Sequence, residues 1–478
     1  MPIPRALLLL LVVILAACAG PGDLPSPIVA PPAGASAAAA VYQQVSPAVA
    51  FIETVDSTGS GALLLDRYVI TNAHVVWPYT RVRVVFPDGA EFADASVRGW
   101  DLTADLALIG PLDTAITPLP LADGEDLPIG SELYLIGYPD EYEAFPQPAM
   151  TRGILSRLRQ WETGGITYVQ TDAAIAGGQS GGVLVTERGN IIGISGFMYG
   201  DSFALVASMA DMVDRLQALA GGKSADPAPT QPPARRFQGT LDNVWSTAVY
   251  RIVAPPDTTV DIEVASDADL KYTVLDIDGD PTLEVDDVIS GAEQGAVTLT
   301  PDYAPYFLVI EQFDETRSRF TVQASADLIP FPDAEDGRAA VWDDWLAGTI
   351  DYPGDYDYHT LTLHAGDLVQ IDVDSLQIDS FVQIFFLNEW ENYQAWNDDD
   401  GSGIYGENAR LIYQAPADGE YVITVSAYSY GGDIPVGGYF LRLTTAPPGS
   451  EPAPYGPPGE EEEEGSDEAH TRPARGQQ

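Results

Sequence analysis

Short stretches of alternating apolar and polar residues, separated by glycine, proline and aspartate, make up most of the chain between about residues 45 and 208. This pattern predicts many short β-strands rather than long helices. In G-S-G-A-L-L-L-D-R-Y-V-I-T-N-A-H-V-V it predicts a hairpin around Asp66 and Arg67, with residues 71–74 at a strand end. Because a strand end exposes its side chains, we expect His74 to be accessible.

The pattern becomes helical in the stretch A-S-M-A-D-M-V-D-R-L-Q-A-L-A. Its apolar residues recur three or four positions apart, as one face of an amphipathic helix requires. They are Met209, Met212, Val213, Leu216 and Leu219. We expect this helix to pack on the strands before it, with its methionines in the core and not in a ligand site.

Beyond residues 221–236, which are rich in glycine, alanine and proline, two strand-rich and aspartate-rich units of about 100 residues follow one another. The segments G-T-L-D-N-V and A-V-Y-R-I-V of the first match G-T-I-D-Y-P and Y-H-T-L-T-L of the second, which indicates a repeat. Short alternating strands without long helices predict a β-sandwich for each unit. The whole chain is therefore expected to be mainly β.

Composition limits the partners that the chain can have. Its 478 residues leave room for about three domains. With 22 basic and 71 acidic residues its net charge is −49, which argues against nucleic acid or anionic lipid headgroups as partners. The chain contains only two lysines, Lys223 and Lys271. This scarcity of lysine fits either a saline habitat or a biased genomic base composition.

The first 18 residues have the pattern of a bacterial export signal: Arg5, then an apolar run that is too short to span a membrane, then L-A-A-C. That ending resembles a lipobox, which implies that Cys18 becomes a lipid-carrying N-terminus; a plain signal peptide with an incidental cysteine is the alternative. Cys18 is the only cysteine, so no internal disulfide can form. Residues 19–40 predict an extended tether, and the tail from 447, with glutamates at 460–464, predicts disorder.

Residues 170–183, Q-T-D-A-A-I-A-G-G-Q-S-G-G-V, have the composition of a nucleophile loop. Glycines on both sides of Ser180 let the backbone turn sharply and approach a ligand. The N–H groups of Gly178 and Ser180 could converge on a developing oxyanion, while Gln179 points elsewhere. An ordinary glycine-rich turn between strands remains the alternative for this stretch alone.

An active Ser180 needs a histidine base, and that histidine needs an orienting carboxylate. His74 is the only histidine before the proline-rich linker. In D-L-T-A-D-L-A-L-I-G, Asp105 precedes a short apolar run typical of a buried strand, where its carboxylate would need a hydrogen-bond partner. Asp101 is the rival, and its position indicates a solvated turn.

The blocks around these residues, taken in order, resemble the chymotrypsin-fold serine proteases of the HtrA (Deg) family. They are G-S-G-A-L-L-L, Y-V-I-T-N-A-H-V-V, F-P-D-G-A-E-F, A-D-L-A-L-I, L-I-G-Y-P, G-I-L-S and V-Q-T-D-A-A-I-A-G-G-Q-S-G-G. The resemblance covers residues 45–217 and implies a double β-barrel with His74 as base, Asp105 as its orienter, Ser180 as nucleophile, and Gly178 with Ser180 as oxyanion donors. No segment resembling the PDZ domain of that family follows.

The fold implied by this resemblance places the specificity pocket at Ala174, six positions before Ser180, and along the strand that contains Ser195, Gly196 and Phe197. Because Ala174 carries no charge, we expect a small aliphatic or apolar side chain rather than lysine or arginine. Gln179 replaces the aspartate with which trypsin-like zymogens bind a freed N-terminus. We therefore expect no zymogen cleavage.

The second unit resembles the bacterial pre-peptidase C-terminal domain through A-G-D-L-V-Q-I, N-D-D-D-G-S-G and A-D-G-E-Y-V-I-T-V, and the first unit resembles it more weakly. The fold alone specifies no ligand. Two acidic loops could offer oxygen ligands to Ca²⁺, although solvated turns explain them as well. Their aspartates are Asp276, Asp278 and Asp280, and Asp398, Asp399 and Asp400. The catalytic residues call for no cofactor.

The prolines at 227, 229, 232 and 233 predict a stiff spacer. We therefore expect few packing contacts between the sandwich units and the protease-like part. The predicted organisation is 1–18 lipoprotein signal peptide, 19–40 tether, 41–220 protease domain, 221–236 linker, 237–331 and 332–446 β-sandwiches, and 447–478 disordered acidic tail.

Two functions fit this organisation. The first is a lipid-anchored, ATP-independent serine endopeptidase that cleaves exposed or misfolded polypeptides outside a bacterial cytoplasmic membrane. The second is a catalytically inactive protease fold that presents two sandwich modules to a cell-wall, glycan or protein ligand. The complete set of His74, Asp105 and Ser180 favours the enzyme, because an inactive descendant is expected to lose one of the three. Oligomeric state and physiological substrate have no signal in the sequence.

Overall fold

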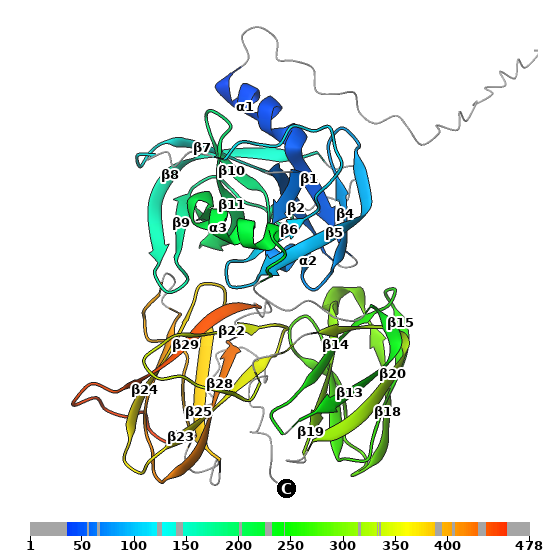
Figure 1. Cartoon of the computed structure of the whole chain (residues 1–478), viewed down its shortest axis with the longest axis vertical. Helices are drawn as coiled ribbons and strands as arrows, with labels where there is room; N and C mark the ends of the chain where they lie inside the picture. Colours follow the sequence, from blue (N-terminus) through cyan, green and yellow to red (C-terminus); the bar gives the residue numbers. More distant parts are fainter. Residues whose placement is uncertain are drawn as a thin grey trace, which may run out of the picture.

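Two β-barrels lie above two further β-sheet units, which stand side by side (Figure 1). The structure is a computed structural model that describes residues 36–456 apart from thirteen short gaps. The gaps are 55–56, 65–66, 122–126, 140–146, 200–202, 225–231, 243, 314–316, 332, 334–335, 388–393, 404–406 and 429–435. The export signal and Cys18 lie outside the described residues.

The first barrel closes in the strand order β1-β2-β3-β6-β5-β4. Its strands are β1 Val49–Glu53, β2 Thr58–Leu64, β3 Tyr68–Thr71, β4 Arg81–Val85, β5 Glu91–Asp101 and β6 Leu106–Ile109. The predicted hairpin is confirmed, because β2 and β3 pair antiparallel. A four-residue helix, α2 Ala73–Val76, follows β3 and carries His74.

The second barrel closes in the order β10-β11-β12-β9-β8-β7. Its strands are β7 Glu132–Gly137, β8 Ala149–Trp161, β9 Ile166–Thr171, β10 Val183–Thr186, β11 Ile191–Tyr199 and β12 Phe203–Ser208. The predicted helix is confirmed as α3 Met209–Ala220, which buries Met209, Met212, Leu216 and Leu219. It packs against β5 and β6 as well as against β11 and β12, so it joins the two barrels.

The first sheet unit contains eight strands: seven lie in one hydrogen-bonded path, β17-β16-β19-β14-β20-β15-β18, and β13 pairs with β20 off this path. They are β13 Ala234–Leu241, β14 Ala248–Val253, β15 Thr258–Ser266, β16 Leu270–Leu275, β17 Pro281–Val285, β18 Gly291–Leu299, β19 Tyr306–Gln312 and β20 Ser318–Phe331. The early part of β20 pairs with β13 and β15, and its end pairs with β14. The path therefore folds over on itself and encloses one apolar core.

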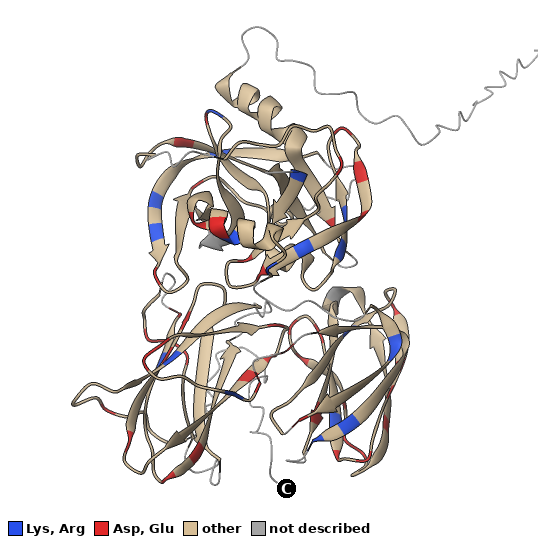
Figure 2. Ribbon diagram, viewed as in Figure 1, with Lys and Arg blue, Asp and Glu red and all other residues tan. Residues whose placement is uncertain are grey.

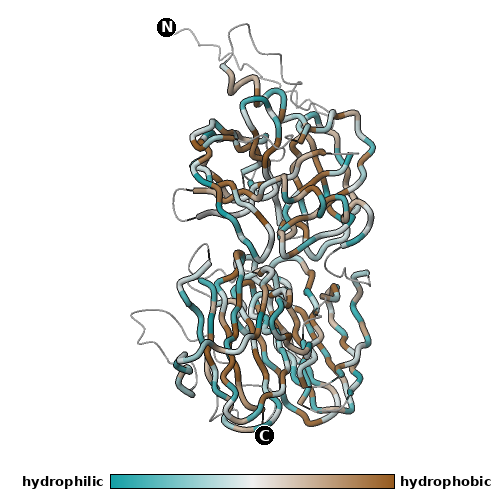
Figure 3. Tube along the Cα trace, turned by 60° about the vertical axis from the view of Figure 1, so that its left-hand side comes forward, coloured by the Kyte–Doolittle hydropathy of each residue, from teal (hydrophilic) through white to brown (hydrophobic). Residues whose placement is uncertain are grey.

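The second unit is a sandwich of a five-stranded and a four-stranded sheet. Its strands are β21 Arg338–Ala339, β22 Leu346–Ile350, β23 Tyr356–Leu363, β24 Leu368–Ser375, β25 Ser380–Phe386, β26 Gln394–Asn397, β27 Ala409–Gln414, β28 Gly419–Ala427 and β29 Gly437–Thr445. The apolar core lies between the two sheets. Figure 3 shows stretches of hydrophobic residues running through the interior of the upper and lower parts of the molecule.

The predicted repeat is confirmed by the strand pairing of the two units. In the first unit β13 pairs with β20, β14 with β19, β15 with β18 and with β20, and β16 with β17 and with β19. In the second unit β22 to β29 make the same pairs in the same order. One topology thus occurs twice.

The expectation of few contacts across the linker is wrong. Trp77, just after α2, packs edge-on against Phe331 of β20 with ring centroids 5.4 Å apart. The guanidinium of Arg251 on β14 lies over the ring of Tyr79, 5.4 Å from its centroid. Aromatic and cationic side chains of the first sheet unit therefore bind the segment that follows His74, because apolar surface on both bodies is removed from water together.

The second sheet unit also packs on the barrels. Trp161 lies edge-on to Phe440, with ring centroids 5.6 Å apart, and its Nε1 donates to Asp374 Oδ1 over 3.0 Å. Leu376 belongs to the apolar core of the barrels. The two sheet units meet each other at Trp245 and Tyr358, whose rings are 5.4 Å apart. The pair of barrels, the first sheet unit and the second sheet unit are three bodies, and each contacts the other two.

Both ends of the described chain differ from the expectation. Helix α1 Ala37–Val45 begins inside the predicted tether and buries Val41 and Val45. At the other end, residues 447–456 lie against the second sheet unit, where Ala453 N donates to Ile412 O over 2.8 Å. These ten residues are therefore not part of a free tail, because backbone hydrogen bonds hold them on the sheet.

Charged residues occur on all three bodies (Figure 2). The acidic excess of the chain is therefore not confined to the glutamates of the tail. None of the helices in the described ranges is long and apolar enough to cross a membrane.

Candidate active site

His74 and Asp105 form a doubly hydrogen-bonded pair between α2 and the turn before β6. His74 Nδ1 lies 2.8 Å from Asp105 Oδ2, and the backbone N–H of His74 donates to Asp105 Oδ1 over 3.0 Å. Asp105 is 5% exposed, whereas 38% of the His74 side chain is exposed. The carboxylate is therefore buried behind an imidazole that a substrate can reach.

The pair sets the ionisation and the tautomer of His74. Burial lowers the pKa of the imidazole, and the charge and hydrogen bond of Asp105 raise it; the net shift is upward from the ordinary value. Since an ionised carboxylate only accepts, Nδ1 carries the proton in the neutral ring. The other nitrogen, Nε2, then has a free lone pair and can act as a base.

Asn72 connects this pair to the loop that contains Ser180. Its Nδ2 donates to Asp105 O over 2.9 Å, and its Oδ1 accepts from Gly181 N over 2.5 Å. The side chain is 4% exposed. One buried amide thus fixes the residue next to Ser180 relative to Asp105. The sequence contains no periodic signal for this role, because a single buried polar residue does not change a hydrophobic pattern.

Ser60 fastens the same loop to the first barrel. Its backbone N–H donates to Ser180 O over 2.8 Å, and its Oγ donates to Gly178 O over 2.9 Å. A Cβ on Gly59 would lie 2.6 Å from Val75 of α2 and 3.3 Å from Ser180 O. Ser180 is therefore held beside the helix that carries His74, at the boundary between the barrels.

The backbone around Ser180 leaves two donors available. Gln179 N donates to Ala176 O, and Gly181 N to Ser195 O and Asn72 Oδ1, whereas Gly178 and Ser180 donate no backbone hydrogen bond within the described part of the chain. Gly178 has φ +80°, which a residue with a side chain would adopt only with strain. Gln179 is buried and its Oε1 accepts from Ala176 N, so it points away as expected.

His74 and Ser180 share no hydrogen bond among the described residues. Such bonds are often long or misaligned without substrate and shorten in the reacting complex. The evidence that His74 and Ser180 belong to one site is therefore the set of contacts made by Asn72, Ser60 and Gly59.

Asp101 is not the solvated turn residue that its position indicates. It is 6% exposed, and its Oδ2 pairs with Arg215 Nη1 of α3 at 2.5 Å. Its Oδ1 accepts from Ala104 N over 3.0 Å. The ion pair with Arg215 makes this burial tolerable, and Asp101 shapes the turn instead of contacting His74.

The predicted pocket residues lie at different depths. Gly196 is against Asn72 and Asp105, because a Cβ there would be 3.5 Å from Asn72 Nδ2 and 3.7 Å from Asp105 Oδ2. Ser195 is fully buried, and Ala174 is exposed with its carbonyl accepting from Thr151 Oγ1 over 2.6 Å. Phe197 lies on β11, but its side chain is outside the described part.

The acidic loops are occupied by hydrogen bonds within the chain. Asp276 Oδ1 accepts from the backbone of Asp278 and Asp280, and Asp400 pairs with Arg410 at 3.1 Å. Asp398 and Asp399 share this last loop, where Asp399 N donates to Asp398 Oδ1. These contacts are those of closed turns, and Ca²⁺ binding by either loop stays a prediction.

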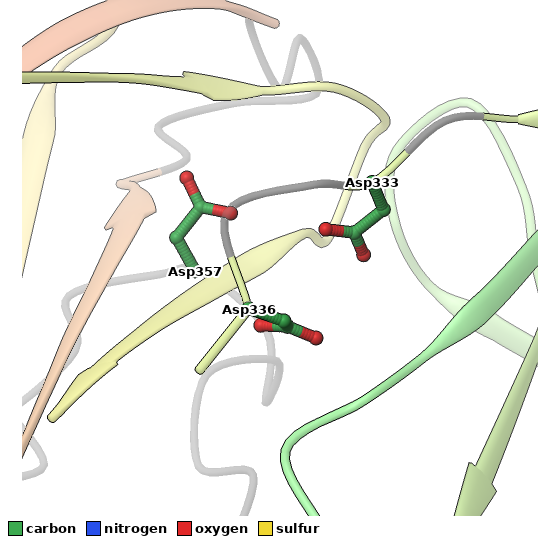
Figure 4. A group of neighbouring side chains, drawn as sticks. All are labelled: Asp333, Asp336 and Asp357. Carbon is green, nitrogen blue, oxygen red and sulfur yellow. The ribbon is translucent and has the colours of Figure 1, made fainter. Parts of the chain in front are cut away.

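A further acidic group, at Asp333, Asp336 and Asp357, lies between the two sheet units (Figure 4). One oxygen of each lies within 4.8 Å of the others, a spacing that a divalent cation could bridge. Thr247 Oγ1 donates to Asp333 and Asp336. These hydrogen bonds link the first sheet unit to the segment that joins it to the second sheet unit. This acidic group has no signature in the sequence, because its members are dispersed along the chain.

Comparisons with known proteins divide the chain in the same way as the structure. Residues 59–194 match the trypsin-like peptidase domain, and residues 355–427 match the bacterial pre-peptidase C-terminal domain. The chain is 34% identical over 176 residues to serine protease HTR4 of Rattus norvegicus, covering 33% of this chain and 35% of that protein. It is 38% identical over 143 residues to periplasmic serine endoprotease DegP of Escherichia coli, covering 29% of each.

Among solved structures, the HtrA-type protease AlgW with tripeptide matches with 27% identity and a TM-score of 0.35, over 39% of this chain and 64% of that one. The chain thus contains a trypsin-like serine peptidase domain of the HtrA type, followed by a pre-peptidase C-terminal domain. It spans about a third of the length of the two curated relatives.

Proposed function

We propose that this chain is an exported, lipid-anchored serine endopeptidase that hydrolyses peptide bonds of exposed or misfolded polypeptides. The observation that carries the proposal is the Asn72 amide, which joins Asp105 of the doubly hydrogen-bonded His74 pair to Gly181 beside Ser180. These contacts support a site at the boundary between the barrels that contains base, orienting carboxylate and nucleophile. The reaction needs no cofactor, because these side chains supply both nucleophile and base.

In the first half of the reaction, Ser180 Oγ attacks the carbonyl carbon of the scissile bond while His74 Nε2 takes its proton. Asp105 stabilises the imidazolium that forms. The N–H groups of Gly178 and Ser180 bind the negative oxygen of the tetrahedral intermediate. Collapse of this intermediate breaks the C–N bond, and His74 gives its proton to the leaving amine.

In the second half, a water molecule attacks the acyl group on Ser180 and His74 takes the proton from that water. The second tetrahedral intermediate breaks its bond to Ser180 Oγ, which regains a proton from His74, and the new carboxylic acid leaves. Ala174 supports a preference for a small or apolar side chain before the cleaved bond, because it offers no charge to a basic side chain.

A fluorophosphonate probe tests the function. Because the probe reacts only with an activated serine, wild-type protein should gain one adduct on Ser180, located by peptide mass spectrometry, and should cleave casein. The Ser180→Ala variant is the matched control and should gain none. Folded wild-type protein with neither an adduct nor casein cleavage would support the binding-module function instead.

Attachment to a membrane through Cys18 is the second part of the proposal, and it places the protease outside the cytoplasmic membrane. Several acyl chains, as on bacterial lipoproteins, give stable attachment where one chain gives only marginal binding. Mass spectrometry of the native N-terminus should therefore find an acylated Cys18, and Cys18→Ala should release the protein from membranes. A mature N-terminus that starts after Cys18 without lipid would disprove the anchor.

A further inference from the structure

The turn formed by residues 101–105 carries Asp105 in an uncommon backbone conformation. Asp105 has φ +49°, in the left-handed region that non-glycine residues visit rarely, although aspartate tolerates it better than most. Such conformations persist where the surroundings fix them. Both oxygens of Asp105 are committed to His74, so a shift of this turn would move the carboxylate away from its partner.

On the barrel side, Asn72 holds the end of this turn at Asp105 O, and Leu102 and Ala104 lie in the apolar core of the barrels. Asp101 caps the turn at Ala104 N, and Arg215 of α3 binds Asp101. Arg215 also donates through Nη2 to Gly164 O over 2.8 Å, in the turn between β8 and β9. The two turns are thus linked through a single guanidinium, at the edge of the barrels that faces the second sheet unit.

The second sheet unit meets both of these turns. Gln377, between β24 and β25, donates from Nε2 to Thr103 O over 2.9 Å in the middle of the 101–105 turn. Its Oε1 accepts from Gly438 N over 2.6 Å, which fixes the direction of the amide. Asp374, three residues earlier, accepts hydrogen bonds from Trp161 and Thr163 of the neighbouring turn.

The backbone of β29 touches the same turn. A Cβ on Gly438 would lie 2.6 Å from Thr103 Cα, so the two backbones pass too closely for any side chain. Since this neighbour is a backbone atom, it could yield only by displacing the turn. The second sheet unit therefore contacts the 101–105 turn both through the hydrogen bond of Gln377 and through close backbone packing at Gly438.

We infer that the second sheet unit positions the catalytic carboxylate of the protease domain: Gln377 and Gly438 hold the 101–105 turn so that Asp105 stays aligned with His74. The inference builds on the proposed function. It makes Gln377 a positioning residue, since it acts through Thr103 and does not touch substrate, and it gives the pre-peptidase C-terminal domain a part in the active site of the same chain.

The test uses the full chain with Gln377→Met, a neutral change of similar length that removes both hydrogen bonds of the amide. The matched control is Gln383→Met, which removes the bond from another half-buried glutamine of the same unit to Gln394. Gly438→Ala is a second, independent variant, which presses on Thr103 without altering Gln377. Thermal unfolding of each variant shows that the unit is still folded.

The first readout is the pKa of His74, followed by NMR with labelled histidine, of which the chain has four. Asp105 raises the pKa of His74, so a displaced Asp105 should lower it in Gln377→Met and Gly438→Ala but not in Gln383→Met. Asp105 is the charged group that faces this imidazole. This readout does not require the protein to hydrolyse anything.

The second readout is kcat/KM on a short apolar peptide against pH. His74 must be neutral to act as base, so activity is lost as pH falls through its raised pKa. In Gln377→Met we expect kcat/KM to fall about tenfold, mostly in kcat, because the half-buried carbonyl of Thr103 loses its donor. The acid limb should move to lower pH.

The outcomes separate the two hypotheses. A lowered His74 pKa in a protein whose wild type hydrolyses no peptide would defeat the proposed function and keep the positioning role. An active wild type in which Gln377→Met and Gln383→Met share one His74 pKa and one pH profile would overturn the positioning role.

Discussion

Ser180→Ala should abolish peptide hydrolysis, lowering kcat by a factor on the order of 10⁶. His74→Ala should cost as much, and the double variant no more, because members of a catalytic set act as a unit and their losses do not add. Single-turnover assays of purified full chain, with active-site titration of the wild type, measure these losses.

The control for Ser180→Ala is Ser131→Ala, which removes an exposed serine of the second barrel that donates to Pro128 O. That variant should keep wild-type turnover. Losses of Ser180→Ala and His74→Ala that multiply in the double variant would show that the two residues do not act in one step.

Asp105→Asn should leave the fold intact and lower kcat by about 10⁴. The geometry gives the reason. The amide oxygen must face the backbone N–H of His74, since an NH₂ group there would meet another donor, so the NH₂ group faces Nδ1. Nδ1 then becomes an acceptor and the ring proton moves to Nε2, which can no longer take the proton of Ser180.

Asp101→Asn is the matched comparison for that variant. It weakens the pair with Arg215 and so should lower the melting temperature, but its effect on kcat should be far smaller than that of Asp105→Asn. If Asp101→Asn were the damaging change and Asp105→Asn were silent, the assignment of the carboxylate would be wrong.

Elements with a repeated pattern could be predicted from the sequence. The hairpin before His74, the helix at 209–220 and the strands of both sheet units each repeat an apolar spacing over several residues, so one misplaced residue does not hide them. The short apolar run after Asp105 forms β6, which is buried throughout. That run distinguishes Asp105 from Asp101 in the sequence.

Features that depend on two distant surfaces could not be predicted. Trp77, Phe331 and Phe440 have the residue types of ordinary core positions, and no local pattern shows that their partners lie in another body. The prolines of the linker indicate that the linker is stiff, but they do not indicate which faces of the barrels and of the sheet units come into contact. Asn72 and Ser60 are single polar residues whose partners are backbone groups far along the chain.

The hydrogen bond from Gln377 to Thr103 joins residues 274 positions apart. During synthesis the barrels emerge first and the second sheet unit last, and domains generally fold in that order. Contacts between such distant residues form late, since the intervening chain must first be closed into a loop. With the positioning role inferred for Gln377, a newly made protease domain would lack the support of the 101–105 turn until nearly the whole chain has been produced, which would tie the maturation of its activity to the completion of its own synthesis.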